Sequence, residues 1–461
     1  MEQQTGDTRD TGHILSTANT SPRGLFSELS QSFGPVFVFR VFSTAISFAT
    51  LALVGRALGA TGLGDLSVAR ALMLTAAGLL GPALDTAAVR FATREPETAD
   101  LYLRAILWVK SALAGLLLVV GFLAASLLRN LLFHSDPSTP VSPWLVTAAL
   151  AGAGGFMLFE YVRVYFQARQ RFGLYGGLDF GHALIRLVAI SILLVAGWRS
   201  PLLVFVAYAA IPWVLSVVGL PLLSYSHHAT RLEIWNRLRE MFYFIRWVAV
   251  ACALTSAANG ADMLLLGWFR IGEVPRGDYS AARALAQVGD LAVLSLFSVL
   301  LPKAGTCRDA NTTRSFLIRY SLPLVVGCTV CSVLLVLMSP FLRFVLRFTF
   351  GEEFTRATLC LAVLLFGTFM ALWGVPASAT VYSLGRSRLI AILEGLKLLI
   401  FVSVAAFLAP RYGILGMAWT TVVAKGTISL LTMACAWWTT DARRGSGGQP
   451  TEPRLAPAIS E

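Results

Sequence analysis

The sequence predicts an all-α polytopic membrane protein with about twelve transmembrane helices, arranged as two pseudo-symmetric six-helix lobes around a central cavity. Composition predicts the membrane class: 56% of the 461 residues are hydrophobic, only 13% are charged, and the mean hydropathy is +0.70. Soluble globular domains carry about 25% charged residues. A phrase that occurs twice in the chain predicts the two lobes.

Each predicted span is an apolar run of roughly 20 residues, the helix length that crosses about 30 Å of hydrocarbon. The spans cover residues 33–55, 66–89, 103–128, 143–166, 177–197, 202–225, 247–269, 281–301, 316–339, 359–382, 389–408 and 414–438. We expect disordered cytoplasmic tails at residues 1–32 and 439–461, an N-terminal lobe at 33–225, a cytoplasmic linker at 226–246 and a C-terminal lobe at 247–438. The linker sequence is basic and amphipathic, which suits an interfacial hinge.

The distribution of Lys and Arg predicts the orientation. In short loops these residues gather on the side of the two termini, which the positive-inside rule assigns to the cytoplasm. The net charge of +12 is therefore a signal of topology and of anionic lipid, and no nucleic-acid partner is expected. The chain has no phosphate-binding loop with its lysine, no large extramembrane segment and no His and carboxylate cluster at metal spacing. It predicts a transporter, not an enzyme, with no cofactor and no metal.

The repeated phrase reads GDLSVARAL from Gly64 to Leu72 and GDYSAARAL from Gly277 to Leu285. Aligning the two copies carries span one onto span seven and span two onto span eight. Internal repeats of this kind are typical of transporters, with the substrate site at the interface between the halves. We expect the glycines to permit a tight connection, and Asp65 and Asp278 to cap the helix that follows.

Polar side chains that share one helical face predict a cavity inside the membrane. Such stripes are Arg40, Ser43, Thr44 and Ser47 in span one; Thr255, Ser256, Asn259 and Asp262 in span seven; Arg283, Gln287 and Asp290 in span eight; and Asp179, His182 and Arg186 in span five. A charge at mid-membrane costs about 2.5–3.5 kcal/mol, so it persists only beside a partner or water. An internal salt bridge is favoured for Glu394 with Lys397, and a water-filled cavity for Arg40.

The candidate site follows from these stripes and from the repeated phrase. The candidate cavity residues are Arg40, Ser43, Thr44, Ser47, Arg70, Asn259, Arg283 and Gln287, and the candidate coupling or switch residues are Asp262 and Asp290. Arginine binds phosphate and sugar hydroxyls through two parallel hydrogen bonds, so arginines that face a cavity suit an anionic, sugar-bearing ligand.

Five stretches resemble one family, and together they cover nearly all of the chain between the tails. They are GRALGATGLGDLSVARAL, ARQRFGLYG, DMLLLGWFRIGEVPRGDYSAARALA, SLGRSRLIAILEGLKLL and YGILGMAWTTVVA. The chain resembles the polysaccharide flippases, the O-antigen or Wzx type, of the multidrug, oligosaccharidyl-lipid and polysaccharide exporter superfamily. The family often has several cavity lysines, and we expect this chain to depart from that pattern.

The resemblance implies a basic, V-shaped cavity that opens alternately to the cytoplasm and the periplasm of a bacterial inner membrane. The implied cargo is an oligosaccharide on undecaprenyl diphosphate, whose lipid tail leaves through a side portal near helices one and eight. Arg40 and Arg283 would hold the diphosphate, and Asp262 matches an aspartate common in the family's seventh helix. Glycan polymerase or assembly proteins are expected as partners, and a proton or sodium ion as the coupling ion.

Two other classes of function stay open from the sequence. A cation-coupled drug antiporter of the same superfamily would favour an acidic and aromatic cavity, whereas the charge excess inside these spans is basic. A non-transporting scaffold for glycan assembly would not need polar stripes on paired helices.

Overall fold

The computed structural model describes residues 22–79, 81–133, 142–225, 230–305, 310–383 and 387–445. Every regular element in these ranges is helical, which confirms the all-α prediction. Residues 1–21 and 446–461 of the predicted tails lie outside the described ranges. The outer ends of the first and last helices, residues 22–32 and 439–445, extend into the tail segments expected from the sequence.

The helices run in chain order and are joined by short connections. The first half of the chain forms α1 (Pro22–Gly78), α2 (Gly81–Arg94), α3 (Ala99–Leu123), α4 (Ala125–Leu132), α5 (Pro143–Ala168), α6 (Phe172–Val195) and α7 (Pro201–Gly219). The second half forms α8 (Arg231–Trp268), α9 (Glu273–Gly305), α10 (Ala310–Leu337), α11 (Ser339–Thr349), α12 (Thr358–Ser383) and α13 (Ser387–Gly445). Short 3-10 turns occupy Pro96–Thr98, Leu220–Leu222 and Glu352–Ala357.

Ten helical segments of the described chain are long and apolar enough to cross a membrane. Two of them, Val38–Arg94 and Leu389–Trp438, each contain two predicted spans, so these segments account for all twelve. A single glycine breaks each long helix: Gly59 in α1 has φ 69° and Gly413 in α13 has φ 59°. Only glycine enters this left-handed region without steric cost, so it reverses the chain there without a loop.

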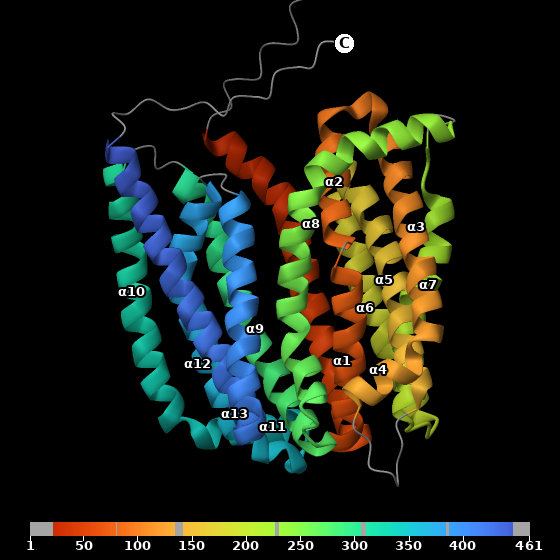
Figure 1. Cartoon of the computed structure of the whole chain (residues 1–461), viewed down its shortest axis with the longest axis vertical. Helices are drawn as coiled ribbons and strands as arrows, with labels where there is room; N and C mark the ends of the chain where they lie inside the picture. The colour runs from red at the N-terminus through yellow and green to blue at the C-terminus, as the bar shows by residue number, and fades with distance from the viewer. Residues whose placement is uncertain are drawn as a thin grey trace, which may run out of the picture.

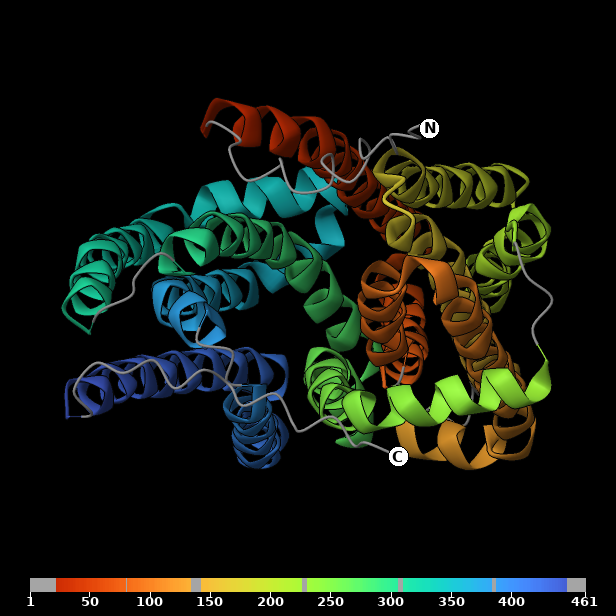
Figure 2. The ribbon, with the colours of Figure 1, turned by 90° about the horizontal axis from the view of Figure 1, so that it is seen from above.

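The helices form two lobes that lie side by side. Figures 1 and 2 show α2–α7 in one group and α10, α12 and α13 in the other, with α1, α8 and α9 between them. Large apolar side chains such as Phe122, Leu123 and Val195 are exposed on the outside of the bundle, as expected for surfaces that face lipid. The two lobes of six helices confirm the fold class predicted from the repeat.

The two copies of the repeated phrase touch each other at the end of the protein opposite the termini. The hydroxyl groups of Ser67 and Ser280, which are equivalent in the repeat, are hydrogen-bonded. A Cβ on Gly277 would lie 1.9 Å from the carbonyl oxygen of Ala60, and one on Gly64 would lie 2.5 Å from that of Glu273. These two glycines therefore allow α1 and α9 to pack closely across the lobe interface, rather than forming a turn. We call this contact the closed end.

The predicted capping role of Asp65 and Asp278 is wrong. Asp65 lies inside α1, well after the break at Gly59, and Asp278 lies inside α9, which begins at Glu273. Asp65 instead pairs with the fully buried Arg276, Oδ1 to Nη2 at 3.2 Å. The Asp65–Arg276 pair therefore lies in the contact between the lobes, whereas Asp278 lies 3.9 Å from the exposed Arg356.

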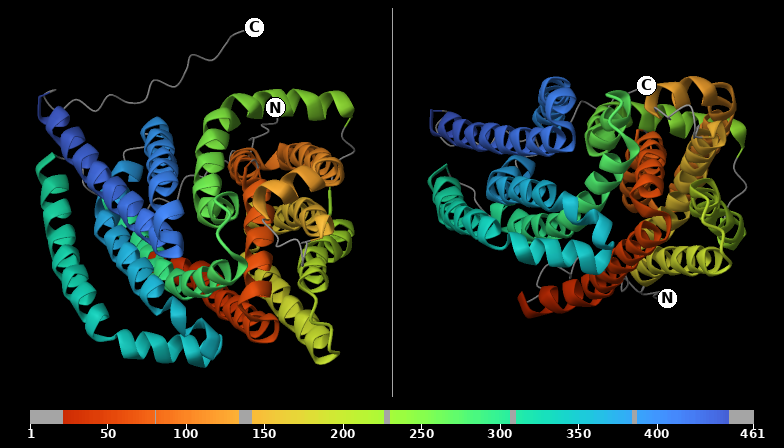
Figure 3. Two further views of the ribbon diagram at one scale, coloured as in Figure 1. Left: turned by 60° about the horizontal axis from the view of Figure 1, so that its bottom comes forward. Right: turned by 90° about the horizontal axis from the view of Figure 1, so that it is seen from below.

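Residues 231–246 of the predicted linker form the first part of α8. A capping box starts the helix: the Thr230 hydroxyl accepts from the Glu233 backbone N–H, and the Glu233 carboxylate accepts from that of Thr230. This hydrogen bond holds the pKa of Glu233 below its usual range. Figures 2 and 3 show the first part of α8 crossing the ends of the N-terminal helices before the chain turns into the membrane segment Val248–Trp268. Its buried side chains Ile234 and Met241 pack on that lobe.

The closed end yields a first test. We expect Gly277→Ala to destabilise the purified protein by about 1–3 kcal/mol, because the added methyl group overlaps the backbone of α1. Unfolding in detergent measures the change. Gly327→Ala in α10 is the matched control, because a Cβ there meets nothing within 4 Å. Equal stability of the two variants would contradict the close packing.

Candidate functional site

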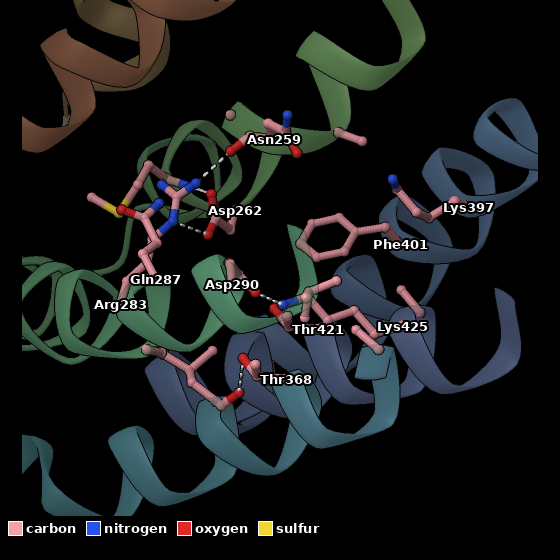
Figure 4. Close-up of a pocket in the computed structure, with 18 of the residues that line it drawn as sticks. Asn259, Asp262, Arg283, Gln287, Asp290, Thr368, Lys397, Phe401, Thr421 and Lys425 are labelled. Atoms are coloured by element: carbon pink, nitrogen blue, oxygen red, sulfur yellow. Dashed lines mark hydrogen bonds and ion pairs between the residues drawn. The ribbon is translucent and has the colours of Figure 1, made fainter. Parts of the chain in front are cut away.

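A cavity of about 940 Å³ lies between the lobes. Side chains from α1, α8, α9, α12 and α13 line it, and it extends from Ser67 and Ser280 at the closed end to Tyr382 and Glu394 toward the side of the termini. Figure 4 shows the wall formed by α8, α9, α12 and α13. We call this cavity between the lobes the central cavity. Six of the predicted site residues line it: Arg70, Asn259, Asp262, Arg283, Gln287 and Asp290.

A second cavity of about 360 Å³ lies in the N-terminal lobe, between α1, α5, α6, α7 and one face of α9. We call it the N-lobe cavity. The predicted span-one stripe, Arg40, Ser43, Thr44 and Ser47, lines it, together with the span-five residues Asp179, His182 and Arg186. Arg70 and Gln287 line both cavities, so the two spaces adjoin at these side chains. All ten predicted site residues therefore face one cavity or both.

Asp262 is held by three donors on the wall of the central cavity. Its Oδ2 lies 2.9 Å from Nε of Arg283 and accepts a hydrogen bond of 3.0 Å from the hydroxyl of Tyr279. Its Oδ1 accepts from the backbone N–H of Met263 at 2.8 Å. Arg283 also donates to the carbonyl oxygen of Asn259 (Figure 4). Asp262 and Arg283 thus neutralise each other inside the membrane, and α8 is tied to α9.

The other charged groups on the central cavity's C-terminal wall are also paired. Lys425 of α13 lies 3.1 Å from Asp290 of α9 (Figure 4). Lys397 lies 2.6 Å from Glu394, one turn away on the same helix. The Glu394–Lys397 pair is an internal salt bridge, as expected, and it lines the cavity as well. Sequence reasoning missed Lys425 as a site residue. Its signal was a lone lysine inside the apolar stretch TTVVAKGTISLL.

The N-lobe cavity has a different charge pattern. Arg163 of α5 pairs with Glu160 and lies 3.6 Å from Asp179 of α6, so it satisfies both carboxylates on this wall. In the described part of the chain Arg186 donates to two uncharged groups, the hydroxyls of Ser47 and Tyr208. Among the described residues no carboxylate lies within ion-pair distance of Arg40, Arg70 or Arg186. Sequence reasoning also missed Arg163 and Glu160, whose signal was the charged stretch EYVR inside an apolar span.

Another charged pair lies apart from both cavities. Lys110 of α3 is fully buried, with Nζ bonded to Asp85 of α2 and 3.2 Å from the carbonyl oxygen of Met157. It joins three helices of the N-terminal lobe. The sequence offered a signal, since Lys110 is the one lysine in its span, but no partner could be assigned from spacing.

The Asp262–Arg283 pair can be measured by a double-mutant cycle. Removing either partner leaves a charge without its counter-ion. The stability losses of Asp262→Ala and Arg283→Ala should therefore sum to more than the loss measured for the double variant. We expect a coupling energy of about 1–3 kcal/mol from unfolding in detergent. The control cycle uses Arg347 and Glu352, which lie 3.3 Å apart with side chains 63% and 77% exposed, and should couple by about 0–1 kcal/mol. A buried coupling no larger than the control would refute the pairing.

Comparison with solved structures shows a shared fold. The lipid II flippase MurJ, in an inward closed conformation, is similar with a TM-score of 0.68 at 14% identity, over 88% of this chain and 90% of that one. A MATE-family multidrug resistance transporter of the MOP superfamily, in an inward-facing conformation, gives 0.61 at 16%, over 89% and 96%. A MOP superfamily transporter from Pyrococcus furiosus gives 0.62 at 14%, over 92% and 97%.

Sequence comparison with curated proteins gives no match. The family model described as polysaccharide biosynthesis protein, however, matches residues 31–305, which is more than half of the chain and includes both copies of the repeated phrase. The chain therefore belongs to the polysaccharide biosynthesis protein family.

Proposed function

We propose that this protein is a flippase that moves an undecaprenyl-diphosphate-linked oligosaccharide from the cytoplasmic to the periplasmic leaflet of a bacterial inner membrane. Family membership and the fold shared with a lipid II flippase support a role of this kind. The observation that carries the proposal is that arginines from both lobes line two cavities that adjoin each other. Arg40 of the first lobe lines the N-lobe cavity, and Arg283 of the second lobe lines the central cavity.

In this proposal Arg40 and Arg283 bind the diphosphate. Guanidinium groups form paired, charge-assisted hydrogen bonds with phosphate oxygens. Arg283 is paired with Asp262 in this structure, so an arriving diphosphate competes with that carboxylate for Arg283. The hydroxyl and amide groups of Ser43, Asn259 and Gln287 would bind sugar hydroxyls.

The lipid tail requires a way out of the cavity toward the bilayer. The N-lobe cavity lies between α1 and α9, which contribute Arg40 and Val288 to its wall, and both side chains are exposed. A portal between these two helices would let the prenyl chain stay in lipid while the polar headgroup enters protein. The sequence resemblance implies a portal near the first and eighth spans, and these spans lie in α1 and α9.

Alternating access would proceed by separation of the repeated phrases. With both termini in the cytoplasm, the closed end faces the periplasm and the central cavity receives cargo from the cytoplasmic side. Release of Asp262 and Asp290 from their basic partners would couple cargo binding, or a proton or sodium ion, to opening. Export of a small cation is disfavoured, because the cavity charges that lack an ion-pair partner among the described residues are arginines. The proposed role is transport, not catalysis.

Arg40→Ala and Arg283→Ala should each reduce flipping by at least about tenfold, since loss of one charge-assisted contact costs about 1.5–3 kcal/mol. Lysine at either position should restore only part of the rate, because it cannot form the paired contact. The assay follows a fluorescent undecaprenyl diphosphate oligosaccharide in proteoliposomes, by its access to an impermeant sugar-oxidising reagent.

Arg199→Ala is the matched control, because Arg199 is exposed between α6 and α7 and lines neither cavity. It should flip cargo at the wild-type rate. Wild-type rates in both cavity variants would refute the site. Absence of glycan movement with the wild-type protein, together with cation-dependent drug efflux, would assign an antiporter instead.

A further inference from the structure

Arg186 is a buried cation that has no ion-pair partner among the residues the structure describes. It lies on α6 with only 7% of its surface exposed, inside a membrane-spanning lobe. Its Nη1 lies 3.3 Å from the hydroxyl of Tyr208, and Nη2 donates to the hydroxyl of Ser47. Its Nε has no hydrogen-bond partner among the described residues. Every direct contact of this guanidinium is with an uncharged group.

A second arginine adds to the same charge. Arg70, on the second half of α1, lines the same wall as Arg186 and Tyr208, and its Nε is also buried without a partner in the described structure. Two cations that approach one hydroxyl repel each other, and the low dielectric of a membrane protein strengthens that repulsion. The two carboxylates on this wall, Glu160 and Asp179, pair with Arg163, and neither forms an ion pair with Arg186 or Arg70 in the described structure.

The contrast with the opposite wall indicates a ligand. In the C-terminal half of the central cavity each lining cation has a carboxylate within 3.1 Å. A buried charge without a counter-ion costs several kcal/mol, so it is retained where an anion enters. The N-lobe cavity offers that anion a volume of about 360 Å³, near the lower end of the usual range for small-molecule sites.

We propose that Arg186 and Arg70 form a carboxylate-binding site in the N-lobe cavity, so that the glycan carried by this protein contains an acidic sugar such as a uronic acid. The identification of the ligand as part of a glycan rests on the proposed flippase function. The planar guanidinium of Arg186 matches a carboxylate with two parallel hydrogen bonds. The hydroxyls of Ser43, Ser47 and Tyr208 line the same space and suit the hydroxyls of a sugar ring.

A carboxylate fits this position better than the diphosphate does. The diphosphate is bonded to the lipid, so it stays close to the portal between α1 and α9, where Arg40 lies. Arg186 lies deeper, in contact with Tyr208 of α7. A sugar that extends from the diphosphate into the lobe reaches Arg186 with its own acidic group.

The first arm of the test measures binding without transport. Full-length protein in detergent is heated with D-glucuronate, inorganic phosphate or glucose. Glucuronate should raise Tm more than glucose or phosphate in the wild type and should have no such effect in Arg186→Gln. Arg199→Gln serves as the exposed control and should keep the wild-type response. Stabilisation by phosphate but not glucuronate, or by neither anion, would overturn the proposal.

The second arm compares two lipid-diphosphate glycans that differ only in one sugar, uronic acid or hexose, in proteoliposomes. Arg186→Gln should slow the acidic glycan about tenfold and the neutral one less than twofold, and Arg186→Lys should lie between. Equal loss for both glycans would overturn the proposal. If the wild type moves neither glycan, the flippase function fails, and the binding arm still decides the anion site. Arg70→Gln replaces Arg186→Gln if the latter does not run as a monodisperse species in gel filtration.

Discussion

A charged side chain without a partner costs free energy inside a membrane, and this cost determines how the charged residues of this protein are arranged. Asp262 with Arg283, Asp290 with Lys425 and Asp85 with Lys110 each join two helices through such a pair. Each pair replaces hydration that lipid cannot provide. The positions of these ion pairs therefore determine which helices remain together and which surfaces stay free to separate.

The two lobes share a fold and a repeated phrase, but they differ in how their cavity charges are balanced. Each cation on the C-terminal wall is paired with a carboxylate. In the described structure Arg70 and Arg186 of the N-terminal lobe have no ion pair, and Arg186 is hydrogen-bonded to hydroxyl groups. In the proposed cycle the charged residues of the two lobes therefore have different roles. The C-terminal pairs can exchange partners as cargo arrives, and the N-terminal arginines gain a counter-ion only from the cargo itself.

Much of the fold was predictable because hydropathy is a local property. Twelve apolar runs gave twelve spans, and the repeat gave the two lobes, because each signal lies within a short stretch of chain. The polar stripes likewise identified residues that line the cavities. The family resemblance read from five short stretches is confirmed by the family match.

Long-range contacts were not predictable in the same way. Asp65 was expected to cap its own helix, but its partner Arg276 lies on another helix of the other lobe. Lys425 and Arg163 were missed for the same reason. Lys425 pairs with a carboxylate on another helix, and so does Arg163, whose cavity position depends on how those helices pack. Spacing within one helix identifies which side chains share a face, and the packing of helices decides what that face meets.

The breaks at Gly59 and Gly413 have a mechanical consequence. At each glycine two spans follow one another with no loop between them, one pair at the start of the first lobe and the other at the end of the second. A tilt of one helical half is therefore transmitted directly to the other, because no flexible loop lies between them. The same geometry means that a tag inserted at either glycine would interrupt a continuous helical stretch and separate two spans that now move together.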